Sequence, residues 1–181
     1  MNNVMVRFSL IFGAVAGLLI AASFLWSALS PSEDRYASEW AGYLTMIVAL
    51  SAIFIGIKRY RDRELGGVIK FGQGLLLGLG ISLVASLIYV AGWELHLALT
   101  DHAFIEDYSA GVIAAKKEAG LAGPELEELV ASMEEMKGTY AKPFYRMPMT
   151  FLEIFPVGLL VSLLSAAILR NRKVLPARAV A

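Results

Sequence analysis

Cysteine is absent from this sequence of 181 residues, and charged residues are scarce. Without cysteine these residues form no disulfide and offer no thiolate ligand to a metal. Only 18% of the residues are charged and 57% are hydrophobic, whereas a soluble domain is about 25% charged and about 45–50% apolar. The mean hydropathy is +0.63. The composition therefore predicts a protein whose solvent is largely lipid.

Four long apolar runs account for this excess. We predict spanning helices at about residues 4–29, 40–57, 71–99 and 150–169, within one membrane domain over residues 1–181. A hydrocarbon core of about 30 Å takes about 20 helical residues to cross. Because lipid leaves the backbone without hydrogen-bonding partners, helices are the expected form. The predicted fold class is all-α, an integral membrane four-helix bundle.

The first run has an alternative interpretation as a signal peptide. Arg7 would be its charged start, and Ala28-Leu29-Ser30 resembles a small-residue cleavage site. The apolar core of a signal peptide is about 7–15 residues long, however, and the apolar stretch Phe8–Leu29 has 22. We therefore favour a retained span.

Basic residues are unevenly distributed among the connections. The loop Ser30–Glu39 has one, the loop Lys58–Lys70 has five, and the tail after Leu169 has four. Because Lys and Arg prefer the cytoplasmic side, we expect a multi-pass membrane protein with both termini in the cytoplasm. The basic residues near the inner span ends are Arg7, Lys58, Lys70 and Arg170, and the acidic residues near the outer ends are Glu33, Glu39, Glu94 and Glu153.

The segment 101–149 is too long for a plain connection between the third and fourth spans. An apolar stripe at helical spacing follows Gly123-Pro124 and consists of Leu126, Leu129, Val130, Met133 and Met136. We predict two extracytoplasmic helices that form a hairpin. The stripe would pack on the other helix or on the span ends, or would serve as a partner-binding face. Gly138, Pro143 and Pro148 are expected to interrupt the helical pattern.

Small residues recur four apart inside two of the spans. They are Gly13 and Gly17 in the first span, and Gly74, Gly78, Ser82 and Ser86 in the third. Such spacing allows helices to approach closely. It predicts tight helix packing, and it leaves open whether the packing is within one chain or between copies.

Two carboxylates lie inside apolar runs and form the candidate polar site. Glu94 lies late in the third span and Glu153 lies early in the fourth, so we expect them at a similar outer depth, with Pro156 free to kink the helix nearby. Such a pocket could hold a proton, a cation or an amine, since an ionisable group in lipid is costly. Alternatively, Glu153 caps the local backbone or pairs with Arg146 or Lys142, and Glu94 points toward the headgroups.

His96 is the third member of this candidate site, but it stands two residues from Glu94 and thus on another helix face. We find no nucleophile–base pair and no zinc spacing. No catalytic residue, metal or cofactor is assigned, and no nucleic-acid partner is expected.

The loop after the second span offers a separate set of candidate contacts, Arg59, Arg61 and Asp62. Arg61 and Asp62 could pair and shape the turn. Alternatively, the loop binds lipid phosphate or a cytoplasmic partner.

With its spans placed, the sequence resembles a bacterial family of small membrane proteins catalogued as a domain of unknown function. The likeness covers nearly the whole chain. The matching stretches include Gly42-Tyr43-Leu44, Gly56-Ile57-Lys58-Arg59-Tyr60-Arg61-Asp62, Ser86-Leu87-Ile88-Tyr89-Val90 with Trp93, and Phe151-Leu152-Glu153-Ile154-Phe155-Pro156-Val157-Gly158. The resemblance implies a location in a bacterial inner (plasma) membrane and four spans with a long outer loop, and it implies no activity.

Three hypotheses for function follow. The first is a small non-enzymatic protein, structural or partner-binding, which packs with itself as a homo-oligomer or with a membrane-protein partner. The second is a transporter or an ion- or ligand-binding subunit that uses Glu94 and Glu153. The third is an enzyme acting on lipid or envelope substrates. It is the weakest hypothesis, because the sequence shows no catalytic constellation.

Overall fold

The computed structural model describes residues 2–29 and 39–176, and within these ranges it contains six helices and no strand. The helices are α1 (Asn3–Leu29), α2 (Glu39–Glu64), α3 (Phe71–Leu99), α4 (Ala103–Glu118), α5 (Pro124–Tyr140) and α6 (Pro143–Leu169). Four residues named or counted in the sequence analysis lie outside the described residues: Ser30, Glu33, Arg35 and Arg178.

Four of these helices are long and apolar enough to cross a membrane, over Asn3–Trp26, Tyr43–Glu64, Phe71–Leu99 and Pro143–Leu169. The predicted all-α fold with four spans is confirmed, and the chain is a multi-pass membrane protein. Large apolar side chains point outward on each spanning helix, as contact with lipid requires. Examples are Leu18 on α1, Val48 on α2, Leu87 on α3 and Leu164 on α6.

The second span extends about two turns beyond its predicted end at residue 57. The charged residues that suggested a loop continue the helix, and Lys58 and Asp62 form an i,i+4 ion pair with N–O distance 2.6 Å. The helix ends before Gly66 and Gly67, whose φ values of 61° and 88° are accessible to glycine at little cost.

The fourth span begins at Pro143, seven residues before the predicted position 150. Pro143 does separate two helices, because a proline fits the first turn, where its missing N–H has no helical partner. The expected interruptions at Gly138 and Pro148 are wrong: Gly138 lies inside α5 and Pro148 inside α6. Packing of α6 against α3 outweighs the one hydrogen bond that Pro148 removes.

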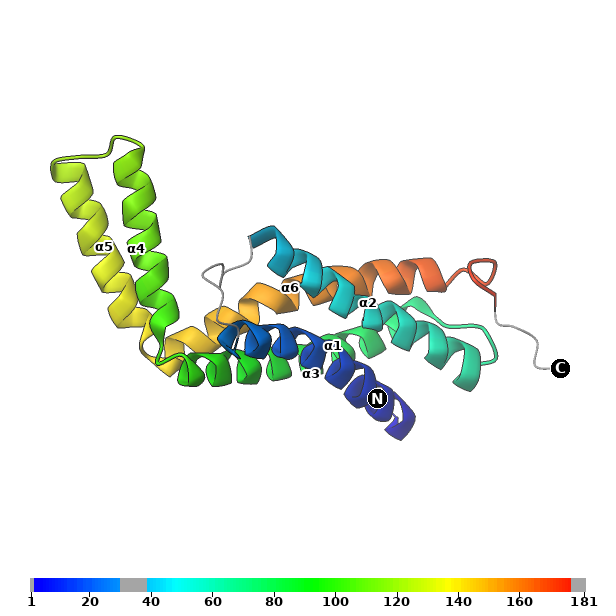
Figure 1. Ribbon diagram of the computed structural model, residues 1–181. Coiled ribbons are helices and arrows are strands. Elements are labelled where there is room, and N and C mark those ends of the chain that lie inside the picture. The colour runs from blue at the N-terminus through cyan, green and yellow to red at the C-terminus, as the bar shows by residue number, and fades with distance from the viewer. Residues whose placement is uncertain (1, 30–38, 177–181) are drawn as a thin grey trace.

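Helix α3 is the centre of the bundle, since it contacts α1, α2 and α6, while α2 also contacts α1 and α6. The core between them is aliphatic. Helices α4 and α5 lie side by side and project from the end of the bundle where α3 ends and α6 begins (Figure 1). We call this end the hairpin end. The opposite end, where α1 begins and α6 ends, is the basic end.

The small residues of the first span lie against α3. A Cβ added to Gly13 would be 2.5 Å from Cβ of Val84, and one added to Gly17 would be 2.7 Å from Cβ of Ile88. Neither distance is compatible with a side chain larger than hydrogen. Both glycines therefore serve helix packing inside this chain.

The small residues of α3 allow the same close packing between α3 and α6. Gly78 faces Ser162, and Gly158 faces Ser82, each at a distance that excludes a Cβ. The Oγ atoms of Ser82 and Ser162 lie 3.1 Å apart between the helices. Ser86 is buried beside them and donates to the carbonyl of Ser82, and Gly74 meets Ala166 one turn nearer the basic end.

Candidate functional site at the hairpin junction

A bidentate ion pair joins α3 to the start of α6 at the hairpin end. Arg146 donates from Nε to Oε1 of Glu94 at 2.8 Å and from Nη2 to Oε2 at 2.6 Å. The Arg146 side chain is 2% exposed and the Glu94 side chain is 22% exposed. Parallel hydrogen bonds of this kind fix geometry as well as charge. Arg146 therefore pairs with Glu94, and not with Glu153 as the sequence allowed.

The same guanidinium also holds the end of α5. Arg146 Nη1 donates to the carbonyl of Tyr140 at 3.0 Å and to that of Ala141 at 3.5 Å. The last carbonyls of a helix have no partner within it, so a cation placed there both satisfies them and faces the negative end of the helix dipole. Arg146 thus ties three helices, α3, α5 and α6, at one point.

Aromatic rings complete the junction around Trp93 of α3. Its indole Nε1 donates to the hydroxyl of Tyr140 at 2.8 Å. Phe104 of α4 packs edge-on against Trp93 with centroids 4.9 Å apart, and Phe24 of α1 does so at 5.0 Å. Every helix except α2 therefore contributes a side chain to the junction. Burial raises the pKa of the Tyr140 hydroxyl above its ordinary range.

His96 packs into this cluster and is 2% exposed. Its ring stacks on Trp93 at 5.0 Å, and Nδ1 lies 3.0 Å from the carbonyl oxygen of Phe24. With one ring nitrogen at that carbonyl, His96 connects α3 to α1. It makes no pair with Glu94, so the structure does not bring these two candidate residues together as one site.

Glu153 lies deeper in the bundle than Glu94 and does not share its level. It stands seven residues after Arg146 on α6, which is about 10 Å along the helix axis. Its carboxylate lies near the hydroxyl of Tyr89, a buried residue of α3. The Glu153 side chain itself is exposed on the surface of the bundle. The expected similar depth of the two carboxylates is wrong, because α6 begins earlier than predicted.

The connection between α3 and α4 is a sharp turn with strained backbone. Asp101 and His102 have φ values of 49° and 58°, in the left-handed region that residues with a Cβ seldom occupy. They line a cavity of about 400 Å³ at the base of the hairpin. The other lining residues are Ile105, Glu106, Lys137, Tyr140, Ala141 and Arg146. Strain of this kind is retained where surrounding contacts over-determine the backbone, as the junction does here.

An ion pair holds the two hairpin helices together above this cavity. Lys137 Nζ lies 2.9 Å from Glu106 of α4 and 2.6 Å from Glu134 of its own helix. Hydrogen bonds to these two carboxylates raise the pKa of Lys137. In contrast to these ion pairs, few side chains are buried between the two hairpin helices. Ser109 is the one buried residue among the described residues of α4, and α5 has none.

The candidate contacts at the basic end divide into two groups. Arg61 is fully buried and donates to Asp62 at 2.7 Å. It also donates to the carbonyls of Leu169, the last residue of α6, and of Val174 and Leu175 beyond that helix. Asp62 also pairs with Lys58. Both Arg61 and Asp62 are thus engaged within the chain. Arg59 is exposed.

Sequence reasoning missed Trp93 and Tyr140 as members of the junction. The sequence does not distinguish these two residues, because aromatic residues near span ends are common in membrane proteins. Among the described ranges 2–29 and 39–176, no three His, Asp or Glu side chains come together as a metal site.

Comparison with known proteins places the chain in a family. The family described as "Protein of unknown function (DUF4199)" matches residues 11–171. An uncharacterized protein of Methanocaldococcus jannaschii is 30% identical over 96 residues, which are 50% of this chain and 65% of that protein. No solved structure matches the chain. The resemblance noted from the sequence is confirmed: the chain belongs to the DUF4199 family of proteins of unknown function.

Proposed function

We propose that this protein is a small non-enzymatic component of a bacterial inner membrane that holds the hairpin α4–α5 outside the cytoplasm for a protein partner. The observation that carries the proposal is the junction of Arg146 with Glu94 and the end of α5. A loop that merely connects two spans needs no such anchorage. A hairpin that presents a surface in a fixed direction does.

The orientation is supported by the charges at the two ends of the bundle. Residues 101–142 carry nine carboxylates and four lysines, a net charge of −5. The basic end carries Arg7, Lys58, Arg59, Arg63, Lys70 and Arg170. Because basic residues favour the cytoplasmic side, the basic end lies inside and the hairpin lies outside.

The surface of the hairpin supports a partner of defined chemistry. The stripe residues Leu126, Leu129, Met133 and Met136 are only half-buried against α4, and Val130 is 37% exposed. Two short helices with so little burial gain little stability from each other. Acidic side chains flank the stripe, so the partner we infer is a protein with an apolar patch bordered by basic residues. A second copy of the hairpin would instead meet like charge.

A photo-crosslinking amino acid at position 130 tests the proposal, with the same probe at position 128 as the matched control. The two positions are about 200° apart around α5 and both are exposed. We expect the probe at 130 to give one discrete product with another protein, in a yield that falls with salt. Equal yields from both positions, or a product of twice the mass of the chain, would contradict this assignment.

A second candidate is ion or ligand binding within the bundle, and the position of Glu153 favours it. Glu94 is matched by Arg146, so this hypothesis rests on Glu153, a carboxylate about three turns inside the span and near the Tyr89 hydroxyl. Reconstituted Glu153→Gln protein tests it, with Glu94→Gln as the comparison. Proton or cation flux that is unchanged by Glu153→Gln excludes this function.

A further inference from the structure

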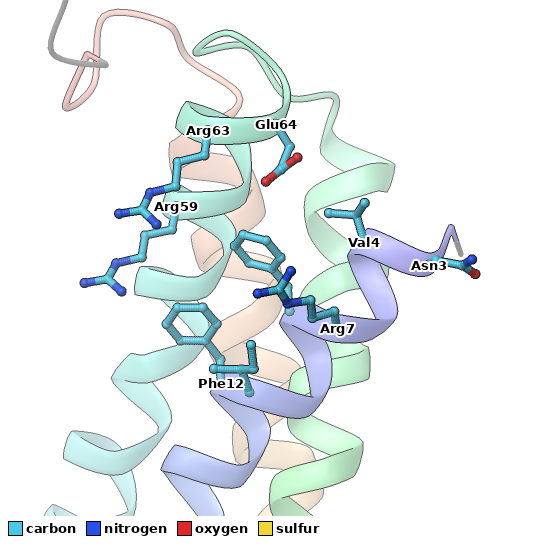
Figure 2. A pocket seen from close by; sticks show the side chains of 9 residues that line it. Asn3, Val4, Arg7, Phe12, Arg59, Arg63 and Glu64 are labelled. Carbon is cyan, nitrogen blue, oxygen red and sulfur yellow. The ribbon is translucent and has the colours of Figure 1, made fainter. Parts of the chain in front are cut away.

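A cavity of about 490 Å³ opens between α1 and α2 at the basic end. Figure 2 shows its lining side chains, which come from the first turns of α1 and the last turns of α2. The lining residues are Asn3, Val4, Arg7, Phe8, Ile11, Phe12, Arg59, Arg63 and Glu64.

Three arginines give this cavity its charge. Arg7 comes from α1, and Arg59 and Arg63 follow one another by four residues on α2, so they stand one above the other on the same helix face. All three are exposed, and none lies within ion-pair distance of a carboxylate in the part of the chain that the structure describes. They contrast with Arg61, whose donors are taken up inside the fold. Glu64 is the one acidic lining residue, which leaves the cavity a charge of +2.

The other half of the cavity is apolar and aromatic. Phe8 and Phe12 stack with centroids 5.9 Å apart, and Phe8 meets Tyr60 edge-on at 5.4 Å. The Arg59 guanidinium lies 5.8 Å above the Phe12 ring, which holds its charge at the boundary between the two halves. From Ile11 the exposed apolar face of α1 continues through Val15 and Leu18 toward the middle of the span.

We propose that this cavity binds an anionic phospholipid, with the phosphate at Arg7, Arg59 and Arg63 and an acyl chain along Phe8, Ile11 and the face of α1 below. Guanidinium groups bind phosphate oxygens through paired hydrogen bonds, and Arg is preferred over Lys where such pairing matters. A free phosphate would use the arginines and leave the apolar wall unoccupied. A zwitterionic lipid would pack its acyl chain on the apolar wall, but its headgroup would bring no net charge to the arginines. An orientation signal alone would need neither a cavity nor an aromatic wall.

The test uses the full chain, stripped of lipid in a neutral detergent, so that no membrane surface potential contributes. Binding of short-chain phosphatidylglycerol, short-chain phosphatidylcholine and inorganic phosphate is measured by native mass spectrometry and by thermal shift. We expect phosphatidylglycerol to bind at least tenfold more tightly than the other two. In the Arg59→Gln/Arg63→Gln variant its affinity falls about tenfold, which corresponds to about 1.4 kcal/mol.

Matched variants distinguish specific binding of the lipid in the cavity from non-specific attraction of an anionic lipid to basic residues. Arg170→Gln/Lys173→Gln removes the same charge from the basic end outside the cavity and is expected to leave the affinity unchanged. Glu64→Gln removes the opposing carboxylate and is expected to strengthen binding, an outcome that a misfolded variant cannot imitate. Equal affinity for the two lipids, equal loss in the two double variants, or phosphate binding as tight as lipid binding would each overturn the proposal.

Discussion

Arg146 and Glu94 meet through two parallel hydrogen bonds of 2.8 and 2.6 Å, 52 residues apart in the sequence. The pair fixes α6 against α3 at the level where the hairpin leaves the bundle. Because Arg146 also binds the last carbonyls of α5, the direction of the hairpin is set by the same side chain. This connection is the physical basis for the proposed presentation of a partner-binding surface.

Arg146→Gln is expected to lower the free energy of unfolding by about 3 kcal/mol, since removing one member of a largely buried pair leaves the other charge unmatched. Glu94→Gln should cost a similar amount, because the buried guanidinium then loses its counter-charge. The double variant should cost less than the sum of the two. Denaturant titration in detergent measures all three, and strictly additive costs would show that the two side chains do not act as a pair.

The hydroxyl of Tyr140 gives the junction a pH dependence at alkaline pH. Its pKa is raised by burial, so the neutral form is favoured in the folded state and its contribution to stability is fully present below about pH 10, the ordinary pKa of tyrosine. As pH rises further the unfolded state ionises first, and this contribution is lost. Hydrogen exchange of α4 and α5, corrected for the base catalysis that speeds exchange of every amide, should therefore report a lower free energy of opening above about pH 10.

Tyr140→Phe is the control for that prediction. The variant loses the hydrogen bond from Trp93, at a cost of about 1 kcal/mol, and should show a weaker alkaline dependence. Some dependence remains, because the raised pKa of Lys137 has the same sign: its ion pairs are intact below the pKa of free lysine and are lost as pH rises. An alkaline profile identical to that of the unsubstituted protein would exclude a role for Tyr140.

Arg61→Lys is expected to release the segment after α6 and to cost about 2–3 kcal/mol. A lysine ammonium cannot reach Asp62 and the carbonyls of Val174 and Leu175 together, as the guanidinium does. Faster proteolysis beyond Leu169 reports the release. Arg63→Lys, in the same helix turn but exposed, should leave both stability and proteolysis unchanged.

Gly13→Ala tests the close packing of α1 on α3. The added methyl would lie 2.5 Å from Cβ of Val84 and 2.8 Å from the carbonyl oxygen of Ile81, so we expect a loss of about 1–3 kcal/mol. Gly72→Ala is the matched control. Nothing lies within 4 Å of its added Cβ, and helix propensity predicts a gain of up to about 1 kcal/mol. Equal effects in thermal unfolding would contradict the assigned contact.

The spans and the hairpin were predictable because hydropathy and helical periodicity depend on residues close in the sequence. The end of α2 and the start of α6 were harder to predict from the sequence. Lys58 and Asp62 look like loop residues until their i,i+4 pairing is considered, and Pro148 looks like a helix end until the packing of α6 on α3 is known.

The partner of Arg146 could not be derived from the sequence. Glu94 and Glu153 both lay within its plausible reach, and the choice depended on where α6 begins. With α6 starting at Pro143, Arg146 falls opposite Glu94, and Glu153 falls two turns deeper beside Tyr89. Such registers are set by packing across the bundle, which local patterns do not encode.

The proposed function requires that the hairpin lies outside the cytoplasm and that the basic end lies inside. Because the sequence contains no cysteine, single cysteines can be introduced at Ser132 and at Lys173 without other changes. Intact cells are treated with a membrane-impermeant maleimide before and after permeabilisation. We expect Ser132→Cys to be labelled in intact cells and Lys173→Cys to be labelled only after permeabilisation. Labelling of Lys173→Cys in intact cells with protection of Ser132→Cys would show the opposite orientation.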